Sequence, residues 1–111
     1  MLPEFEKCWK RMELSDDDLK RLQSDLLLNS QKYPVMQDTG GLRKMRFALE
    51  GRGKSGSVRV VYVDFLIYDT IYLISAYSKN DKDNLSKAER NAVKSVIETL
   101  ESQIKNKRRN K

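Results

Sequence analysis

The chain has 111 residues and a formal net charge of +6, a length that allows one domain with a single modest core. It contains no histidine, the usual general acid–base and commonest metal ligand, and its only cysteine, Cys8, excludes an internal disulfide and a multi-cysteine metal site. No apolar run is long enough to span a membrane and the N-terminus lacks the apolar core of a signal peptide, so we expect a cytoplasmic protein without cofactor or metal.

The first third of the chain predicts two helices. Ser15 precedes three consecutive aspartates, which is typical of a helix N-terminus, where the helix dipole favours acidic side chains. The second helix is expected to end before Pro34. In both segments the apolar residues recur at helical spacing, which predicts that they pack in a core. These residues are Phe5, Trp9 and Met12 in the first helix and Leu19, Leu22 and Leu26 in the second.

The middle of the chain predicts three strands, because beyond Gly40 the apolar residues recur at every second position. The first strand turns Met45, Phe47 and Leu49 to one face and Lys44 and Arg46 to the other. The second, from Val58 to Phe65, is apolar on both faces and is therefore expected to be central, with Arg59 on the same face as Val61, Val63 and Phe65. The third covers residues 71–77.

The last third predicts one long helix. Ser86 and Glu89 have the spacing of a capping box, which marks a helix start. Its inner stripe is expected to consist of Val93, Val96, Ile97, Leu100 and Ile104. Residues 105–111 are interpreted as a basic, disordered tail. The prediction is a single α+β domain over residues 1–104, a small antiparallel sheet with two N-terminal helices and one C-terminal helix.

The stretch ALEGRGKS, residues 48–55, matches the loose pattern of a phosphate-binding loop. Such a loop must be followed by a helix, whose first amides help to hold the phosphate. Here a predicted strand follows, and the chain is too short for the repeated βαβ units of P-loop proteins. We therefore interpret the stretch as a glycine-rich hairpin loop and expect no bound nucleotide or other small molecule.

Charge is distributed unevenly along the chain. Residues 12–39 hold six acids against three bases, whereas residues 40–62 hold six bases against one acid. Ordinary solubilising charge is one interpretation, and a polyanionic partner is the other. The predicted layout favours the second, because cations from two strands and the glycine-rich loop converge as in a phosphate-backbone site. They are Lys44, Arg46, Arg52, Lys54 and Arg59, which Tyr77 and Lys79 extend with a stacking ring and another cation.

The run TGGLRKMRFALEGRGKSGSVRVVYV, followed by IYLISAYSKNDKDNLSKAE, resembles the RelE/HigB toxins of bacterial type II toxin–antitoxin systems. The resemblance covers residues 3–100 and is closest to the HigB-like branch, which shares the Gly-Gly-Leu-Arg-Lys, Gly-Arg-Gly-Lys and Tyr-x-Lys-Asn motifs. It implies the RelE-like fold of a small sheet flanked by helices. It also implies an mRNA interferase, a small endoribonuclease that enters the A site of the 70S ribosome and cuts translated mRNA.

The resemblance places Lys44, Arg46, Arg59, Tyr77 and Lys79 in the catalytic site. The implied reaction needs no metal, because the RNA 2′-OH attacks its own phosphate and leaves a 2′,3′-cyclic product and a free 5′-OH. Arg46 and Arg59 are expected to clamp the phosphate, Lys44 or Lys79 to take the 2′-OH proton, and Tyr77 to stack on or orient a base. Further RNA contacts are assigned to Arg43, Arg52, Lys54 and Asn80.

The sequence departs from the family pattern at two places. RelE itself has a lysine where Arg46 stands and an arginine next to the position of Lys79, where this chain has Asn80. The identities of the general acid and base therefore stay open. Family members also begin with a β-strand before the segment that matches PEFEKCWKRM. Either the sheet lacks this edge strand or the start codon has been placed too late.

The resemblance implies two partners, a cognate antitoxin of the helix-turn-helix type and the ribosome, and no membrane. Two alternatives remain beside the mRNA interferase. One is a ParE-like toxin of the same fold that inhibits DNA gyrase by binding, and the other is an RNA-binding domain without catalysis. The cations near Arg46 and Arg59 favour the nuclease, because an inhibitor that only binds needs no phosphate clamp.

Overall fold

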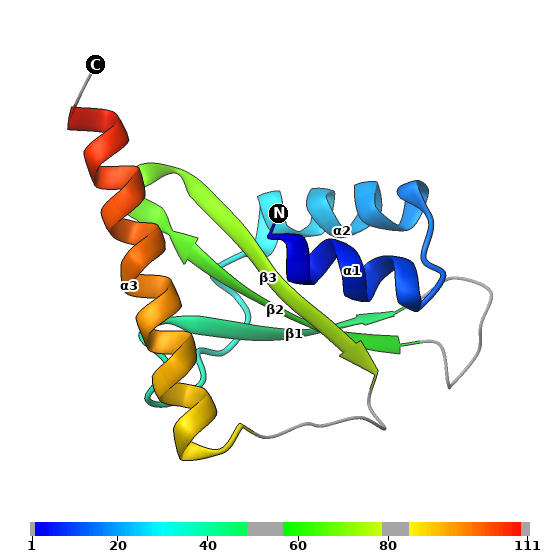
Figure 1. Ribbon diagram of the computed structural model, residues 1–111. Coiled ribbons are helices and arrows are strands. Elements are labelled where there is room, and N and C mark those ends of the chain that lie inside the picture. The colour runs from blue at the N-terminus through cyan, green and yellow to red at the C-terminus, as the bar shows by residue number, and fades with distance from the viewer. Residues whose placement is uncertain (1, 49–56, 79–84, 110–111) are drawn as a thin grey trace.

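The computed structural model describes residues 2–48, 57–78 and 85–109. In chain order the elements are α1 (Pro3–Arg11), α2 (Asp16–Asn29), β1 (Leu42–Ala48), β2 (Ser57–Phe65), the 3₁₀ turn η2 (Leu66–Tyr68), β3 (Thr70–Ser78) and α3 (Lys87–Arg109). The strands form one antiparallel sheet in the order β1-β2-β3, with β2 central as predicted. Helices α1 and α2 lie together beside the sheet and α3 crosses it separately (Figure 1). The α+β class and the order of the helices are therefore confirmed.

One face of the sheet packs against α1 and α2. The rings of Phe5 and Trp9 stack with their centroids 5.3 Å apart, and the Trp9 ring lies 6.2 Å from that of Phe47 on β1. Tyr62 on β2 is fully buried in this layer, and its hydroxyl donates to the Ser30 carbonyl at the end of α2. Burial raises the pKa of Tyr62 to about 12, so this hydroxyl keeps its proton at neutral pH. The larger core of the protein therefore joins both N-terminal helices to all three strands.

Helix α2 begins where the sequence predicted. The Ser15 hydroxyl accepts from the backbone N–H of Asp18, and the Asp18 carboxylate accepts from the backbone N–H of Ser15. This capping box satisfies two amides that the first turn of a helix otherwise leaves without partners. The hydrogen bond from the Ser15 backbone also lowers the pKa of Asp18 below its usual value.

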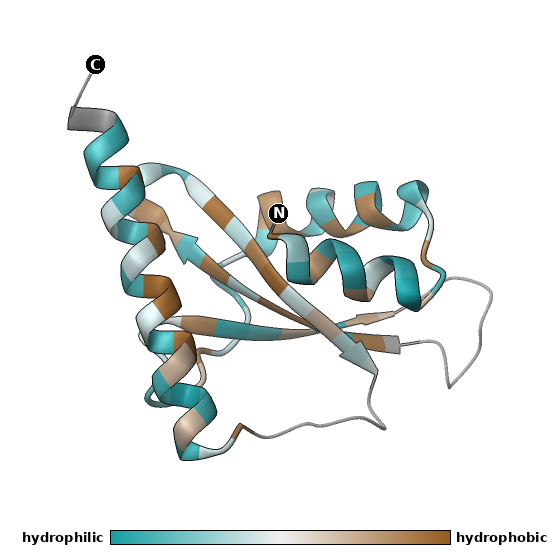
Figure 2. Ribbon diagram, viewed as in Figure 1, coloured by the Kyte–Doolittle hydropathy of each residue, from teal (hydrophilic) through white to brown (hydrophobic). Residues whose placement is uncertain are grey.

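The opposite face of the sheet packs against α3. Its buried cluster consists of Leu42, Val61, Val63, Phe65, Ile97, Leu100 and Ile104. The helix starts at the predicted capping box, in which the Ser86 hydroxyl accepts from the Glu89 N–H and the Glu89 carboxylate from the Ser86 N–H. Brown apolar positions recur along α3 in Figure 2, in keeping with a helix that turns one stripe to the sheet.

Two details of α3 differ from the sequence prediction. Val96 is 44% exposed and lies beside the inner stripe rather than in it, because its neighbour Ile97 takes the buried position. The helix also continues to Arg109, so residues 105–109 of the expected disordered tail are helical. Ile104 is buried and anchors this end to the sheet, and the cations Lys105 and Lys107 suit the negative end of the helix dipole.

The pairing of β2 with β3 contains one irregularity. Val61 lies opposite Ser75, but the next residue, Tyr62, lies opposite Leu73. One residue of β3, Ile74, is therefore extra, which is the geometry of a β-bulge. The pairing of β1 with β2 runs without interruption from Leu42 opposite Val63 to the far end of β1.

A tight turn leads into β1. The side chain of Thr39 is fully buried, and its hydroxyl donates to the Met36 carbonyl at 2.7 Å and accepts from the Leu42 N–H at 3.0 Å. Gly40 and Gly41 follow with φ angles of +77° and +115°, in the region that side chains rarely adopt. The Thr-Gly-Gly motif therefore has a structural role, which is to hold this turn against the start of the sheet.

We expect that Thr39→Val, which keeps the shape of the side chain, lowers the free energy of unfolding by about 1–3 kcal/mol, because it leaves a buried N–H and a carbonyl without their partner. Thr39→Ser keeps the hydroxyl and is the matched control, with a smaller expected loss. Urea denaturation of the three proteins measures the difference. Equal stability of Thr39→Val and the wild-type protein would contradict the role given to this hydroxyl.

Candidate active site

The three strands bring Arg46, Arg59 and Tyr77 into one line across the sheet. In the strand register Arg46 lies opposite Arg59, and Arg59 lies opposite Tyr77. Directly paired residues project from the same face of a sheet. We call these three residues the cross-strand row. They lie on the face that α3 covers. The buried pair Leu42 and Val63 lies on the same face, toward the other end of β1 and β2.

Lys44 lies beside the cross-strand row. It is two residues before Arg46 on β1, so both side chains leave the same face of the strand. Lys44, Arg59 and Tyr77 are half-buried, whereas Arg46 is exposed. Tyr77 packs against the apolar cluster beneath α3, which supports its ring from one side. Four of the five predicted catalytic residues are therefore near one another on one face.

Arg46 and Arg59 lie directly opposite each other, and this pairing says more about the chemistry of the row than any other feature. Like charges placed directly opposite each other on neighbouring strands destabilise a sheet. A pair of guanidinium groups is, however, a suitable receptor for one phosphate, because each group presents a planar set of donors to its oxygens. The arrangement thus favours an anion-binding role over a purely structural one.

Arg43 is not brought to the row. It lies opposite Tyr62, on the face that packs against α1 and α2, because successive residues of a strand point to opposite faces. Its Nη1 donates to the carbonyl of Tyr33 at 2.5 Å and to that of Gln31 at 3.2 Å. The structure therefore does not bring Arg43 beside the other cations, and this side chain ties β1 to the segment after α2. An RNA contact of Arg43 stays a prediction.

The remaining candidates, Arg52, Lys54, Lys79 and Asn80, lie outside the described residues. The strands on either side of the glycine-rich stretch can still be compared with the prediction. Strands β1 and β2 are antiparallel, and β2 begins at Ser57. A strand rather than a helix therefore follows the motif, which confirms that it is not a phosphate-binding loop of the nucleotide-binding kind.

A cavity near Tyr77 involves residues that sequence reasoning did not select. Its volume is about 520 Å³, and Tyr77 shares its lining with Cys8 of α1. The buried Cys8 sulfur lies 3.3 Å from Arg11 Nη2 and 3.4 Å from Glu4 Oε1. Glu4, Cys8 and Arg11 are three or four residues apart on α1, so their side chains lie on the same side of the helix. Only the fold brings this side of α1 beside β3.

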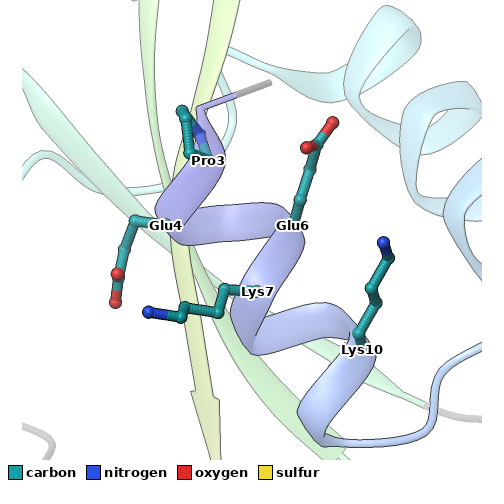
Figure 3. A pocket seen from close by; sticks show the side chains of 5 residues that line it. All are labelled: Pro3, Glu4, Glu6, Lys7 and Lys10. Carbon is teal, nitrogen blue, oxygen red and sulfur yellow. The ribbon is translucent and has the colours of Figure 1, made fainter.

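A second hollow lies on the outer side of α1 and is shown in Figure 3. It is lined by Pro3, Glu4, Glu6, Lys7 and Lys10 and measures about 400 Å³. Glu4 and Lys7 extend to one side of the helix, and Glu6 and Lys10 to the other. Two acids balance two bases, so this hollow lacks the excess positive charge that a phosphate site needs.

Within residues 2–48, 57–78 and 85–109, no group of three or more Cys, Asp or Glu side chains is placed to hold a metal ion. No helix in the same part of the chain is both long and apolar enough to cross a membrane.

Residues 3–109 match the family model described as "RelE toxin of RelE / RelB toxin-antitoxin system". The matched segment includes every helix and strand of the described fold. The match does not separate the branches of the family, so assignment to the HigB-like branch stays a prediction.

Proposed function

Because the chain belongs to the RelE family of toxins of toxin–antitoxin systems, we propose that it is a ribosome-dependent mRNA interferase that cuts translated mRNA in the cytoplasm. The observation that carries this proposal is the pairing of Arg46 with Arg59 in the cross-strand row. Lys44 on the same face and Tyr77 at the end of the row supply the remaining kinds of group that RNA cleavage needs.

The row suits cleavage by the RNA's own 2′-OH. In this reaction the 2′ oxygen forms a bond to phosphorus while the bond from phosphorus to the 5′ oxygen breaks, giving a 2′,3′-cyclic phosphate and a free 5′-OH. Negative charge grows on the phosphate oxygens as the phosphorane forms. Arg46 and Arg59 would stabilise that charge, an effect that is largest when the donors are held in place before reaction. Their positions on two paired strands provide this rigidity.

Two proton transfers accompany the reaction, one from the 2′-OH and one to the departing 5′ oxygen. Lys44 lies next to Arg46 on the same face and is the described residue best placed for one of them. Lys79 is proposed for the other on the resemblance alone. Tyr77, supported by the apolar cluster under α3, would stack on a base and fix the position of the RNA, since every base offers an aromatic face.

A ParE-like inhibitor of DNA gyrase is the second candidate. It has the same fold and a partner antitoxin, but it acts by binding alone. Arg46 and Arg59, at directly paired positions of β1 and β2, support the nuclease instead, because two arginines on one face can hold one phosphate and a protein-binding surface does not require them. Family membership implies an antitoxin in either case, and we propose one of the helix-turn-helix type.

The purified protein should cut mRNA in a translating extract and leave the same mRNA intact without ribosomes. Primer extension locates the cuts, and end analysis should find 2′,3′-cyclic phosphate and 5′-OH ends. A gyrase supercoiling assay on the same sample is the control. Gyrase inhibition without mRNA cleavage would replace the proposal by the ParE-like function. RNA binding with neither activity would leave only an RNA-binding domain.

A further inference from the structure

A groove of about 360 Å³ lies between α3 and the turn that leads into β1. Val63 and Phe65 on β2 and Ile97 on α3 contribute to its lining. In the strand register Val63 pairs with Leu42, the first residue of β1, whereas the cross-strand row crosses β1 at Arg46. The groove and the row therefore occupy opposite ends of the sheet, and a molecule bound in one need not cover the other.

The groove is apolar at its base and at its rim. Val63, Phe65 and Ile97 are buried members of the cluster under α3. Val35 and Leu66 also line the groove and are 50% and 58% exposed, so they rank among the most exposed large apolar residues of the described chain. Exposed apolar side chains around a hollow with polar edges are characteristic of a binding site for another molecule.

The groove is acidic although the protein is basic. Glu98 and Glu101 line it on α3, whereas Asp64 already accepts from the Ser30 hydroxyl at 2.7 Å and Arg43 Nη1 already donates to two backbone carbonyls. The chain as a whole carries +6. RNA is repelled by such a surface, whereas a protein segment with Lys or Arg beside an apolar residue complements both its charge and its apolar base.

One wall of the groove is formed by a hydrogen-bonded turn that packs closely against α3. Gly40 and Gly41 line one side, and a Cβ atom on Gly40 would lie 3.2 Å from Cγ of Lys94 on α3. The turn therefore passes very close to the helix, and the buried hydroxyl of Thr39 fixes the shape of the turn through its hydrogen bonds with Met36 and Leu42. A preformed groove loses little conformational entropy on binding, which favours affinity.

We propose that this groove docks the cognate antitoxin. The docked segment would be amphipathic, with an apolar side chain placed against Val63 and Phe65 and one or more basic side chains facing Glu98 and Glu101. The proposal rests on the proposed toxin function, which supplies a protein partner. It has a specific consequence, namely that antitoxin affinity and mRNA cleavage depend on different ends of the sheet and can be changed separately.

The test compares Glu98→Lys, Glu101→Lys and the double variant with the wild-type protein. The probe is the purified antitoxin encoded next to the toxin gene, and calorimetry gives its Kd. Each reversal should weaken binding roughly tenfold, with a larger effect for the double variant. Added salt should weaken wild-type binding more than that of the double variant. Glu6→Lys, which places the same change on the exposed face of α1, is the matched control and should bind like the wild-type protein.

The same variants are assayed for melting temperature and for mRNA cleavage without antitoxin. Unchanged cleavage with weakened antitoxin binding supports the proposal, because it separates the two ends of the sheet. Unchanged antitoxin affinity in the folded double variant overturns the docking site and leaves the proposed nuclease intact. Absence of cleavage by the wild-type protein overturns the nuclease instead, whatever the antitoxin measurements show. Self-association that the reversals abolish would identify a second copy as the occupant and also overturn the proposal.

Discussion

Replacing Arg59 by alanine is expected to reduce mRNA cleavage roughly 10²–10³-fold, by analogy with the removal of one donor from a preorganised oxyanion site. Arg59 occupies the middle of the cross-strand row, between Arg46 and Tyr77 on the neighbouring strands. Its position near the start of the central strand fixes the backbone from which the guanidinium reaches the phosphate. Arg59 is half-buried near a strand end. If its role were only structural, its replacement by alanine would change the free energy of unfolding by about 0.5 kcal/mol and leave cleavage intact.

Cleavage, melting temperature and antitoxin affinity are measured on the same Arg59→Ala protein. Lys10→Ala is the matched control, because Lys10 is an exposed cation on the outer side of α1, away from the cross-strand row and from the cavity that Tyr77 lines. It should cleave mRNA at nearly the wild-type rate. If Arg46 and Arg59 clamp one phosphate, the double alanine variant should lose less than the product of the two single losses. A folded Arg59→Ala protein that cuts mRNA at nearly the wild-type rate would remove Arg59 from the active site.

Phe5→Ala should lower the free energy of unfolding by about 3–5 kcal/mol. The Phe5 side chain is fully buried, and its ring stacks on Trp9 in the layer that joins α1 to the sheet. A loss of this size is a large share of the 5–15 kcal/mol typical of a single domain. Urea denaturation measures it, and Leu28→Ala is the control, since the Leu28 side chain is 84% exposed and should contribute less than about 0.5 kcal/mol. A change below 1 kcal/mol for Phe5→Ala would contradict the packing described for α1.

The features that depend on a few neighbouring residues were predictable from the sequence. The capping boxes at Ser15 and Ser86 involve residues three positions apart, and both are present. Alternation along β1 correctly placed the buried Met45 and Phe47 on one face and Lys44 and Arg46 on the other. These predictions succeeded because hydrogen bonds within one turn and the period of a strand are local properties of the chain.

The features that depend on contacts between distant segments were not predictable in the same way. Arg43 is an exception, because the strand period, a local property, already places it on the face opposite Lys44 and Arg46. The pairing of Arg46 with Arg59 is a matter of register between strands, which composition does not determine. The acidic groove joins Glu98 and Glu101 on α3 to Val63 and Phe65 on β2, and no local pattern connects the helix to the strand.

The β-bulge at Ile74 also decides which way Tyr77 faces. In an unbroken strand, residues four positions apart point to the same side, yet Leu73 packs against α1 and α2 while Tyr77 packs under α3. The extra residue therefore changes the face to which the following residues of β3 point, and it places Tyr77 on the same face as Arg59. Deletion of one residue between Leu73 and Tyr77 would remove the ring from the row, whereas many substitutions there would not. Among relatives of this protein, the spacing of these positions should accordingly vary in steps of two residues and only rarely by one.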